Sequence, residues 1–432
     1  MTPIDMGTLE SFYSALEDRP LDPGESVYIP YLERSGSDPI AAIQRSILWS
    51  QAASVNLLSG MRGTGKSTEL RRLKKSLQDA GCVVFLGGMQ EYLNLTKPVE
   101  ITDFLISIMG ALGEEVAKRY GSNVIQETYW RRIGNFLQSD IQLGEVSFEA
   151  ETGAGKVGLK ASLKTDPTFK QTIQKALRGH LAKVVDQAHR FAGEVVEAVR
   201  KLESDPNKKV VFLADSVEQL RGVGIEEADE VHRSVESLFC GHAESLHIPL
   251  LHVVYTLPPY LSSLTPGIGR LLGGGAVQSI PSIHVRKRDG QRDPCGIEIM
   301  LEIVTARFSD WRRVFSEPQV ERMARMTGGD LRDFFRMMKA ALLLGGEAPA
   351  LPLSDAIVEK AEKIMQREML PLAADDVKWL RRIAETKPPE LREIAELPRL
   401  ARFFDNHVVL NYRNDEDWYD VHPLLTAEVM RT

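Results

Sequence analysis

The chain has 432 residues, of which 43% are hydrophobic and 26% charged, and these proportions exclude a wholly disordered protein. The 53 Lys and Arg residues are outnumbered by 60 Asp and Glu, and the net charge of -7 argues against a protein that coats nucleic acid non-specifically. No apolar run reaches the roughly 20 residues that cross a bilayer. We therefore expect a cytoplasmic protein of two or three domains that has no membrane partner.

The first elements predict a strand, helix, strand unit. Residues 1–37 are rich in Pro, Gly, Ser and acids, which predicts an arm that lies on a domain surface. A helix is expected to begin at Pro39, because Asp38 can cap it. Val55–Leu58 is typical of a buried strand, an amphipathic helix follows, and Cys82–Leu86 is typical of a second buried strand. This order predicts a right-handed parallel βαβ unit.

Three later apolar runs predict the rest of a parallel sheet. They are Val210–Ala214, Leu250–Tyr255 and Ile280–Val285, and each is rich in β-branched residues. The expected fold class is α/β, with a doubly wound parallel sheet of the P-loop NTPase type over residues 38–299.

An insertion at about residues 145–205 separates the second and third strands. In Val146–Leu163, glycines punctuate alternating apolar and polar residues, and we interpret this segment as an inserted β-hairpin. Gly153-Ala154-Gly155-Lys156 is expected to form a turn, because Val157 stands where a phosphate loop needs a hydroxyl. Phe169–Leu202 has helical periodicity and predicts a long helix that returns to the core.

The C-terminal third predicts two further parts. Residues 300–350 are expected to form a helical lid, in which Ser316 caps one helix and Gly328 breaks it. Residues 351–432 contain short helices and then two strand-like runs, His407–Tyr412 and Trp418–Val421. Helices followed by a β-ribbon predict a winged helix.

A phosphate-binding loop is the strongest motif in the chain. The pattern G-x-x-x-x-G-K-[ST] stands between the first strand and the next helix, which is the context that it requires. Inward-facing amides and the helix N-terminus attract phosphate, Lys66 is expected to reach the β- and γ-phosphates of ATP, and the Ser67 hydroxyl is expected to bind Mg²⁺. The predicted nucleotide contacts are Gly60, Met61, Arg62, Gly63, Thr64, Gly65, Lys66, Ser67 and Thr68.

Asp215 ends the strand at Val210–Ala214, as expected for a Walker B acid that holds magnesium. The alternative is that Asp215 only caps the next helix. Hydrolysis also needs a group that orients water, and Glu218 is the nearest candidate, although it can equally be a solvent-facing helix residue.

Taken together, these motifs resemble AAA+ and STAND P-loop ATPases, in particular the branch of origin-initiator ATPases with a helical lid and a C-terminal winged helix. The resemblance implies that Thr256, at the tip of the fourth strand, acts as sensor 1. It also implies that Gly329-Asp330-Leu331-Arg332 is the sensor 2 motif, in which Arg332 approaches the γ-phosphate. The family includes prokaryotic conflict and defence ATPases, so the resemblance implies an antiviral setting.

Two features depart from the family pattern. Ser216 follows Asp215, where many AAA+ enzymes have Glu, and this favours slow switching over rapid turnover. No arginine finger stands out by its position in the sequence. Arg270, in the loop after Thr256, is the candidate, and an ordinary surface arginine is the alternative.

The charge of the last domain bears on its partner. Residues 371–432 have nine Lys and Arg against twelve Asp and Glu, and the expected tip of the ribbon is acidic. Duplex binding relies on cations, so we expect a protein partner rather than nucleic acid, and self-association stays open. The first hypothesis is an ATP-binding regulatory switch, the second is a DNA-acting initiator or loader, and the third is a small-molecule P-loop kinase.

Overall fold

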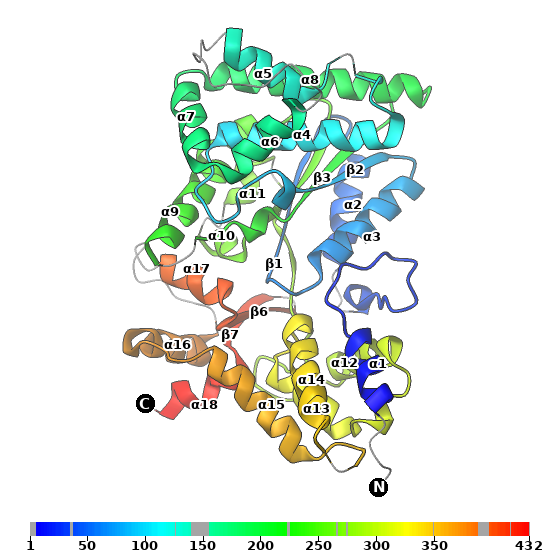
Figure 1. Ribbon diagram of the computed structural model, residues 1–432, viewed down its shortest axis with the longest axis vertical. Coiled ribbons are helices and arrows are strands. Elements are labelled where there is room, and N and C mark those ends of the chain that lie inside the picture. The colour runs from blue at the N-terminus through cyan, green and yellow to red at the C-terminus, as the bar shows by residue number, and fades with distance from the viewer. Residues whose placement is uncertain are drawn as a thin grey trace. The chain divides into compact units, whose positions relative to one another are not determined.

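The computed structural model describes residues 6–34, 38–125, 127–139, 155–222, 225–264, 267–273, 275–348, 350–387, 397–414 and 416–431 (Figure 1). The chain forms two compact units. The sheet unit comprises residues 40–59 and 70–278, and the lid unit comprises residues 1–39, 60–69 and 279–432. Within the described part of the chain, every helix is too short or too polar to span a membrane.

Strands alternate with helices through the first two thirds of the chain, and helices dominate the last third. The strands are β1 (Val55–Gly60), β2 (Val83–Gly88), β3 (Val210–Asp215), β4 (His252–Leu257), β5 (Gln278–Ile280), β6 (Val409–Asn414) and β7 (Glu416–Val421). The α-helices up to the end of the sheet unit are α1 (Met6–Ala15), α2 (Pro39–Trp49), α3 (Lys66–Asp79), α4 (Ile101–Tyr120), α5 (Tyr129–Ser139), α6 (Gly155–Thr165), α7 (Pro167–Leu177), α8 (Leu181–Leu202), α9 (Ile225–Glu236), α10 (Pro259–Leu264) and α11 (Ile268–Leu271). The later α-helices are α12 (Pro294–Arg307), α13 (Glu317–Met326), α14 (Leu331–Gly345), α15 (Asp355–Glu368), α16 (Ala374–Thr386), α17 (Leu397–Asp405) and α18 (Pro423–Arg431).

The main sheet has five strands in the order β2-β3-β4-β1-β5. The pairs β2–β3, β3–β4 and β4–β1 are parallel. From β1 the chain crosses to β2 at the edge of the sheet, and it then returns through β3 to β4, next to β1. Because each crossover is right-handed, this reversal places α3 on one face of the sheet and the helices after β2 on the other. The predicted doubly wound α/β fold of the P-loop NTPase type is confirmed.

The predicted inserted hairpin is wrong where the structure describes it. Residues 155–165 form helix α6, and residues 146–154 lie outside the described residues. Leu159 and Leu163 are both buried, and a spacing of four residues places them on one helical face. The same apolar positions also fit an alternating pattern, which is why the sequence is compatible with a strand. Gly155 and Lys156 accordingly begin a helix and do not form the expected turn.

Two other predicted elements differ in extent. The fifth strand ends at Ile280 and does not reach Val285, because Pro281 has no N–H to donate to the sheet. The next two amides bind elsewhere in the lid unit, Ser282 to the carbonyl of Asn411 and Ile283 to that of Gly329. The predicted helix Phe169–Leu202 is divided into α7 and α8.

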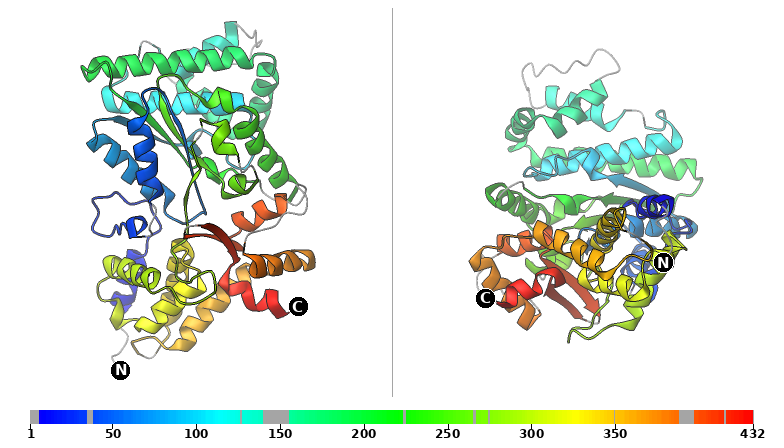
Figure 2. Two further views of the ribbon diagram at one scale, coloured as in Figure 1. Left: turned by 180° about the vertical axis from the view of Figure 1, so that it is seen from behind. Right: turned by 60° about the horizontal axis from the view of Figure 1, so that its bottom comes forward.

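The lid unit joins helices to a two-stranded ribbon, drawn in red in Figure 2. Ser316 and Gln319 form a capping box at the start of α13, as the sequence predicts for Ser316. Strands β6 and β7 are antiparallel, as a predicted ribbon requires, and each extends toward the other beyond the expected range. The ribbon is fastened to the lid helices, because the hydroxyl of Tyr412 donates to the carbonyl of Gly328 over 2.8 Å.

Candidate nucleotide-binding site

The phosphate loop lies where the sequence places it, between β1 and α3. Gly63 and Gly65 have φ angles of +92° and +85°, which a residue with a side chain rarely adopts. The Lys66 side chain is buried and curls back over the loop, where Nζ donates to the carbonyls of Gly60 at 2.9 Å and Met61 at 2.7 Å. The lysine is therefore already held at the position from which it can reach a phosphate.

The lid helix α14 packs directly against the loop. A Cβ atom added to Gly63 would lie 2.7 Å from Cβ of Arg332 and 3.0 Å from Oδ1 of Asp330. Both of these residues begin α14, and the carboxylate of Asp330 caps the helix by accepting a hydrogen bond from the Asp333 amide. The sensor 2 motif predicted from the resemblance is thus in contact with the phosphate loop.

The N-terminal arm makes hydrogen bonds to the phosphate loop and to the first turn of α3. The Tyr31 hydroxyl donates to the carbonyl of Thr64 at 2.8 Å, and the Tyr28 hydroxyl donates to the carboxylate of Glu69 at 3.1 Å. Oγ1 of Thr68 accepts a hydrogen bond from the amide of Leu21 at 3.0 Å. In this structure the arm therefore binds the side chain that the sequence predicts as a secondary phosphate contact.

Arg332 is held by the same arm. Its Nε donates to Oδ2 of Asp18 over 2.7 Å, and the Asp18 side chain is more than half exposed. Both residues line a cavity of about 470 Å³ together with Arg62 and Arg336. Arg332 and Arg336 are paired with the acids Asp18 and Glu368 of this cavity, so an anionic ligand would compete with these carboxylates for the guanidinium groups.

The end of β3 carries the predicted Walker B acid. Asp215 is buried and its Oδ1 accepts a hydrogen bond from the amide of Ser216, whose φ angle is +70°. Thr256, at the end of β4, donates to the carbonyl of Ala214 at 3.2 Å and accepts from the amide of Val217 at 3.0 Å. The predicted sensor 1 side chain therefore fixes the backbone on either side of Asp215.

The sheet register places Asp215 and the end of β1 at the same edge. Ser59 pairs with Leu257, and Ala214 pairs with Tyr255, so β4 lies between the two strands. Two strand spacings amount to about 10 Å. This is the arrangement expected when one strand leads into a phosphate loop and the next but one supplies an acid.

Comparison with known proteins supports the same interpretation. Residues 50–216 match the family model of the AAA domain. No curated protein matches it.

Several solved structures resemble the chain at low sequence identity. A Walker-type ATPase of Pyrococcus abyssi has 12% identity and a TM-score of 0.46, with 97% of this chain and 100% of that one covered. Cdc6p from Pyrobaculum aerophilum has 13% identity and a TM-score of 0.42, with 100% and 98% covered. The ORC2 protein of Aeropyrum pernix has 12% identity and a TM-score of 0.42, with 96% and 95% covered. Similarity of this size does not identify a function.

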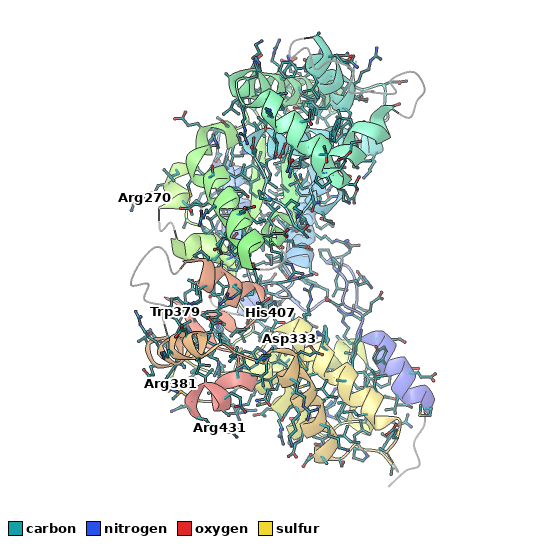
Figure 3. All side chains as sticks on the ribbon, turned by 60° about the vertical axis from the view of Figure 1, so that its left-hand side comes forward. Arg270, Asp333, Trp379, Arg381, His407 and Arg431 are labelled. Atoms are coloured by element: carbon teal, nitrogen blue, oxygen red, sulfur yellow. The ribbon has the colours of Figure 1, made fainter. Side chains whose placement is uncertain are left out.

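The predicted site residues fall into three groups. The phosphate loop and Arg332 are in contact within the lid unit. Asp215 and Thr256 lie at the ends of neighbouring strands in the sheet unit, where Thr256 bonds the residues on either side of Asp215. Glu218 is half-buried in a short turn of 3₁₀-helix that follows Asp215. Arg270 is exposed on the short helix α11 (Figure 3). The roles of these residues, including the shared magnesium of Ser67 and Asp215, stay predictions.

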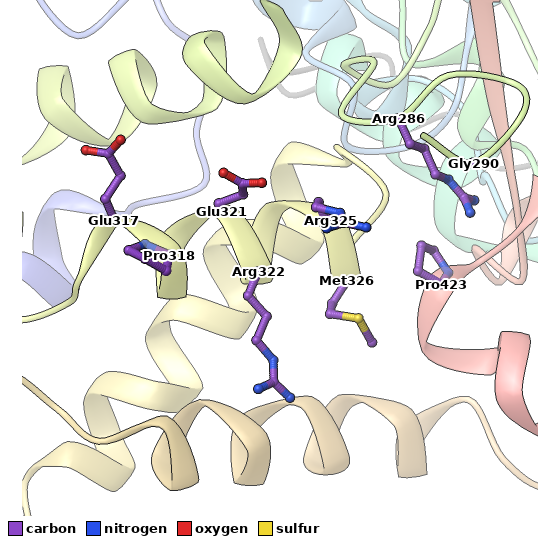
Figure 4. A pocket seen from close by; sticks show the side chains of 9 residues that line it. All are labelled: Arg286, Gly290, Glu317, Pro318, Glu321, Arg322, Arg325, Met326 and Pro423. Carbon is purple, nitrogen blue, oxygen red and sulfur yellow. The ribbon is translucent and has the colours of Figure 1, made fainter. Parts of the chain in front are cut away.

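A second cavity lies away from the phosphate loop and is rich in ion pairs. It measures about 570 Å³ and is lined by residues of α13 together with Arg286, Gly290 and Pro423 (Figure 4). Arg286 pairs with Asp420 at 3.1 Å, and Arg322 pairs with Glu362 at 2.7 Å. Because its lining residues do not belong to the phosphate loop, we assign this cavity no part in nucleotide binding.

The structure contains a cluster of possible metal ligands that was not among the site residues predicted from the sequence. Asp330, Asp333 and His407 are buried and close enough together to bind a metal ion. The two acids stand three residues apart at the start of a helix, so their proximity could have been found from the sequence. His407 is distant in the chain, and no local pattern connects it with them.

Proposed function

We propose that this protein is an ATP-binding, slowly hydrolysing regulatory switch that acts on a protein partner. The observation that carries the proposal is the contact between the phosphate loop and the start of α14, where Gly63 has no room for a side chain beside Arg332. A triphosphate in the loop would be close to a guanidinium on a separate helix. Occupancy of the loop could then set the position of the lid.

Each residue of the loop has a role in this proposal. The amides after Gly60 would bind phosphate oxygens, and Lys66 would exchange its carbonyl acceptors for them. Arg332 would exchange Asp18 for the terminal phosphate, because a phosphate carries more charge than a carboxylate. ATP binding would therefore break this one contact between the arm and the lid.

The residues present also fit a magnesium ion. Ser67 offers a hydroxyl and Asp215 a carboxylate, which are the hard oxygen ligands that Mg²⁺ prefers. When bound, the ion would neutralise charge that develops on the phosphates during hydrolysis. Slow turnover is proposed because Ser216 occupies the position after Asp215 and offers no carboxylate to orient water.

A protein partner is supported by the charges on α17. Both arginines of this helix pair with Asp376 of α16: Arg402 lies 2.9 Å from Oδ1, and Arg399 lies 3.3 Å from the same atom. A helix that binds duplex DNA uses such side chains on phosphates and bases. In this chain they neutralise an acid of their own unit. A setting in antiviral defence rests on the sequence resemblance alone.

A DNA-acting initiator is the second candidate. Helices α16 and α17 and the ribbon β6–β7 follow one another in the order of a winged helix, a fold that binds DNA in other proteins. This candidate requires duplex binding that rises with ATP and falls steeply with salt. Absence of such binding at physiological salt would leave the protein-partner proposal in place.

ATP binding is tested first. Lys66→Ala should abolish binding of a fluorescent ATP analogue, whereas Lys75→Ala on the exposed side of the same helix should bind normally. Normal affinity in the Lys66 variant would overturn the proposed function.

The partner class is tested by adding lysate fractions, treated with nuclease or with protease, to an ATPase assay. Loss of stimulation after protease alone supports a protein partner, and loss after nuclease alone contradicts it.

A further inference from the structure

Four buried ionisable side chains meet where the lid helices join the C-terminal ribbon. Asp330 and Asp333 stand at the start of α14, His407 precedes β6, and His422 follows β7. Nδ1 of His407 lies 3.2 Å from Oδ2 of Asp333 and 4.0 Å from Oδ2 of Asp330. Asp333 and His407 are labelled in Figure 3. The three ligand atoms all lie within 4.8 Å of one another.

The two carboxylates are oriented by contacts on their other oxygens. Oδ1 of Asp330 accepts a hydrogen bond from the backbone amide of Asp333 at 3.0 Å. Oδ1 of Asp333 accepts one from Arg336 at 3.2 Å. Each carboxylate thus presents Oδ2 toward His407. Outer contacts of this kind orient the ligands of metal sites in proteins.

The cluster also leaves buried polar atoms without hydrogen bonds. Oδ2 of Asp330 has no hydrogen-bond partner, and the residue is 0% exposed. Nε2 of the equally buried His422 has none either, and it lies 3.7 Å from Oδ2 of Asp333. A buried carboxylate oxygen is costly to leave without a partner.

We propose that Asp330, Asp333 and His407 form a Zn²⁺ site. Oδ2 of each acid and Nδ1 of the histidine are the three protein ligands, and a water molecule is the fourth. In a tetrahedral zinc site neighbouring ligand atoms are about 3.4 Å apart, so small movements of these side chains suffice. Asp333 and His407 line the cavity of about 470 Å³, which gives the ion and its water access.

The ligand set selects zinc over magnesium. Two carboxylates and a neutral imidazole carry a charge of -2, which a divalent ion neutralises. Nitrogen and oxygen ligands together suit Zn²⁺, whereas Mg²⁺ prefers oxygen ligands in an octahedron. Zn²⁺ would take the place of the hydrogen atom that lies between Nδ1 of His407 and Oδ2 of Asp333.

The site has a consequence for the lid that does not depend on ATP. Its ligands come from the first turn of α14 and from the residues before β6, so the ion would fasten one to the other. Arg332 lies between the two acids in the sequence. Zinc would therefore hold the turn that carries Arg332 in place.

The test uses the full chain, stripped of metal with a chelator and titrated with Zn²⁺ against a chromophoric competitor. We expect one tight site per chain and a rise in Tm on Zn²⁺ addition. His407→Gln should abolish the site, and His242→Gln, outside the cluster, should retain it. Excess Mg²⁺ should not displace the ion.

Two results would overturn the proposal. One is the absence of stoichiometric Zn²⁺ binding to the folded wild-type chain, in which case the cluster is a buried ion-pair network only. The other is undiminished binding by folded His407→Gln. Should that variant not fold, the absorption of Co²⁺ bound to the wild type decides. A spectrum of tetrahedral nitrogen and oxygen coordination supports the site, and the spectrum of hydrated cobalt contradicts it.

Discussion

Arg332, in the first turn of α14, donates a hydrogen bond from Nε to Oδ2 of Asp18 in the N-terminal arm. The same arm binds the phosphate loop through Tyr31 and the start of α3 through Leu21. The arginine proposed to sense a terminal phosphate is thus held by an acid of a segment that also holds the loop. An acid in that place competes with phosphate for the guanidinium.

Asp18→Asn is therefore expected to tighten ATP binding. The Asp18 side chain is more than half exposed, so the gain should be modest, roughly two- to fivefold in Kd. Titration with a fluorescent ATP analogue measures it. Glu17→Gln, the neighbouring acid, is the matched control and should leave Kd unchanged. Equal or weaker binding by the Asp18 variant would show that the arm does not restrain Arg332.

Gly63→Ala should weaken ATP binding and lower Tm. The new Cβ would lie 2.7 Å from Cβ of Arg332, and the φ angle of +92° adds strain of about 1 kcal/mol or more. The control is Gly24→Ala, because a Cβ at Gly24 meets nothing within 4 Å. Both variants are compared by thermal melting and nucleotide titration. A Gly63 variant that matches the wild type in both would contradict the observed contact with α14.

Asp215→Asn should abolish magnesium-dependent hydrolysis of ATP. The substitution keeps the size of the side chain and removes the charge that would attract the cation. A phosphate-release assay with and without Mg²⁺ measures the effect, and Asp205→Asn, in the turn before β3, is the control. An unchanged rate in the Asp215 variant would leave this residue with the alternative role of a cap.

Thr256→Val is expected to destabilise the sheet unit. The hydroxyl is buried and serves both the carbonyl of Ala214 and the amide of Val217. Its removal leaves two buried groups without that partner, at about 1–3 kcal/mol each. Chemical denaturation gives the loss, and Thr256→Ser should restore most of it because the hydroxyl remains. Similar stability of the Val and Ser variants would argue against these bonds.

The stability of the protein should fall as the pH drops from about 6.5 to about 4. Burial, with the charges of Lys209 and Arg200, lowers the pKa of His252 to about 4. Below the ordinary pKa of about 6.5 the unfolded chain binds a proton at this histidine that the folded chain does not. The free energy of unfolding therefore falls by on the order of 3 kcal/mol by pH 4. Denaturation midpoints at several pH values measure it. His252→Asn should reduce this dependence without removing it, because burial also lowers the pKa of His422 to about 4, and His180→Asn should leave it unchanged.

The sequence predicts the features that local pattern determines. Glycine spacing and a lysine define the phosphate loop, and contiguous apolar runs define β1 to β4. The prediction for the segment that contains Leu159 and Leu163 is wrong, because their spacing satisfies both a strand and a helix. The bond between Asp18 and Arg332 joins distant parts of the chain, so no local period could reveal it.

The packing of Tyr412 against the turn before α14 determines where the chain can be truncated. A Cβ atom at Gly328 would lie 2.5 Å from the Tyr412 hydroxyl and 2.4 Å from Cδ1 of Leu410. The turn before α14 therefore packs closely against the ribbon. Tyr412 also stacks on Trp418 with ring centroids 4.3 Å apart. A fragment truncated after the lid helices would expose to water the surface of that turn that packs against Leu410 and Tyr412. Removing residues 351–432 should thus yield aggregating material rather than an isolated ATPase.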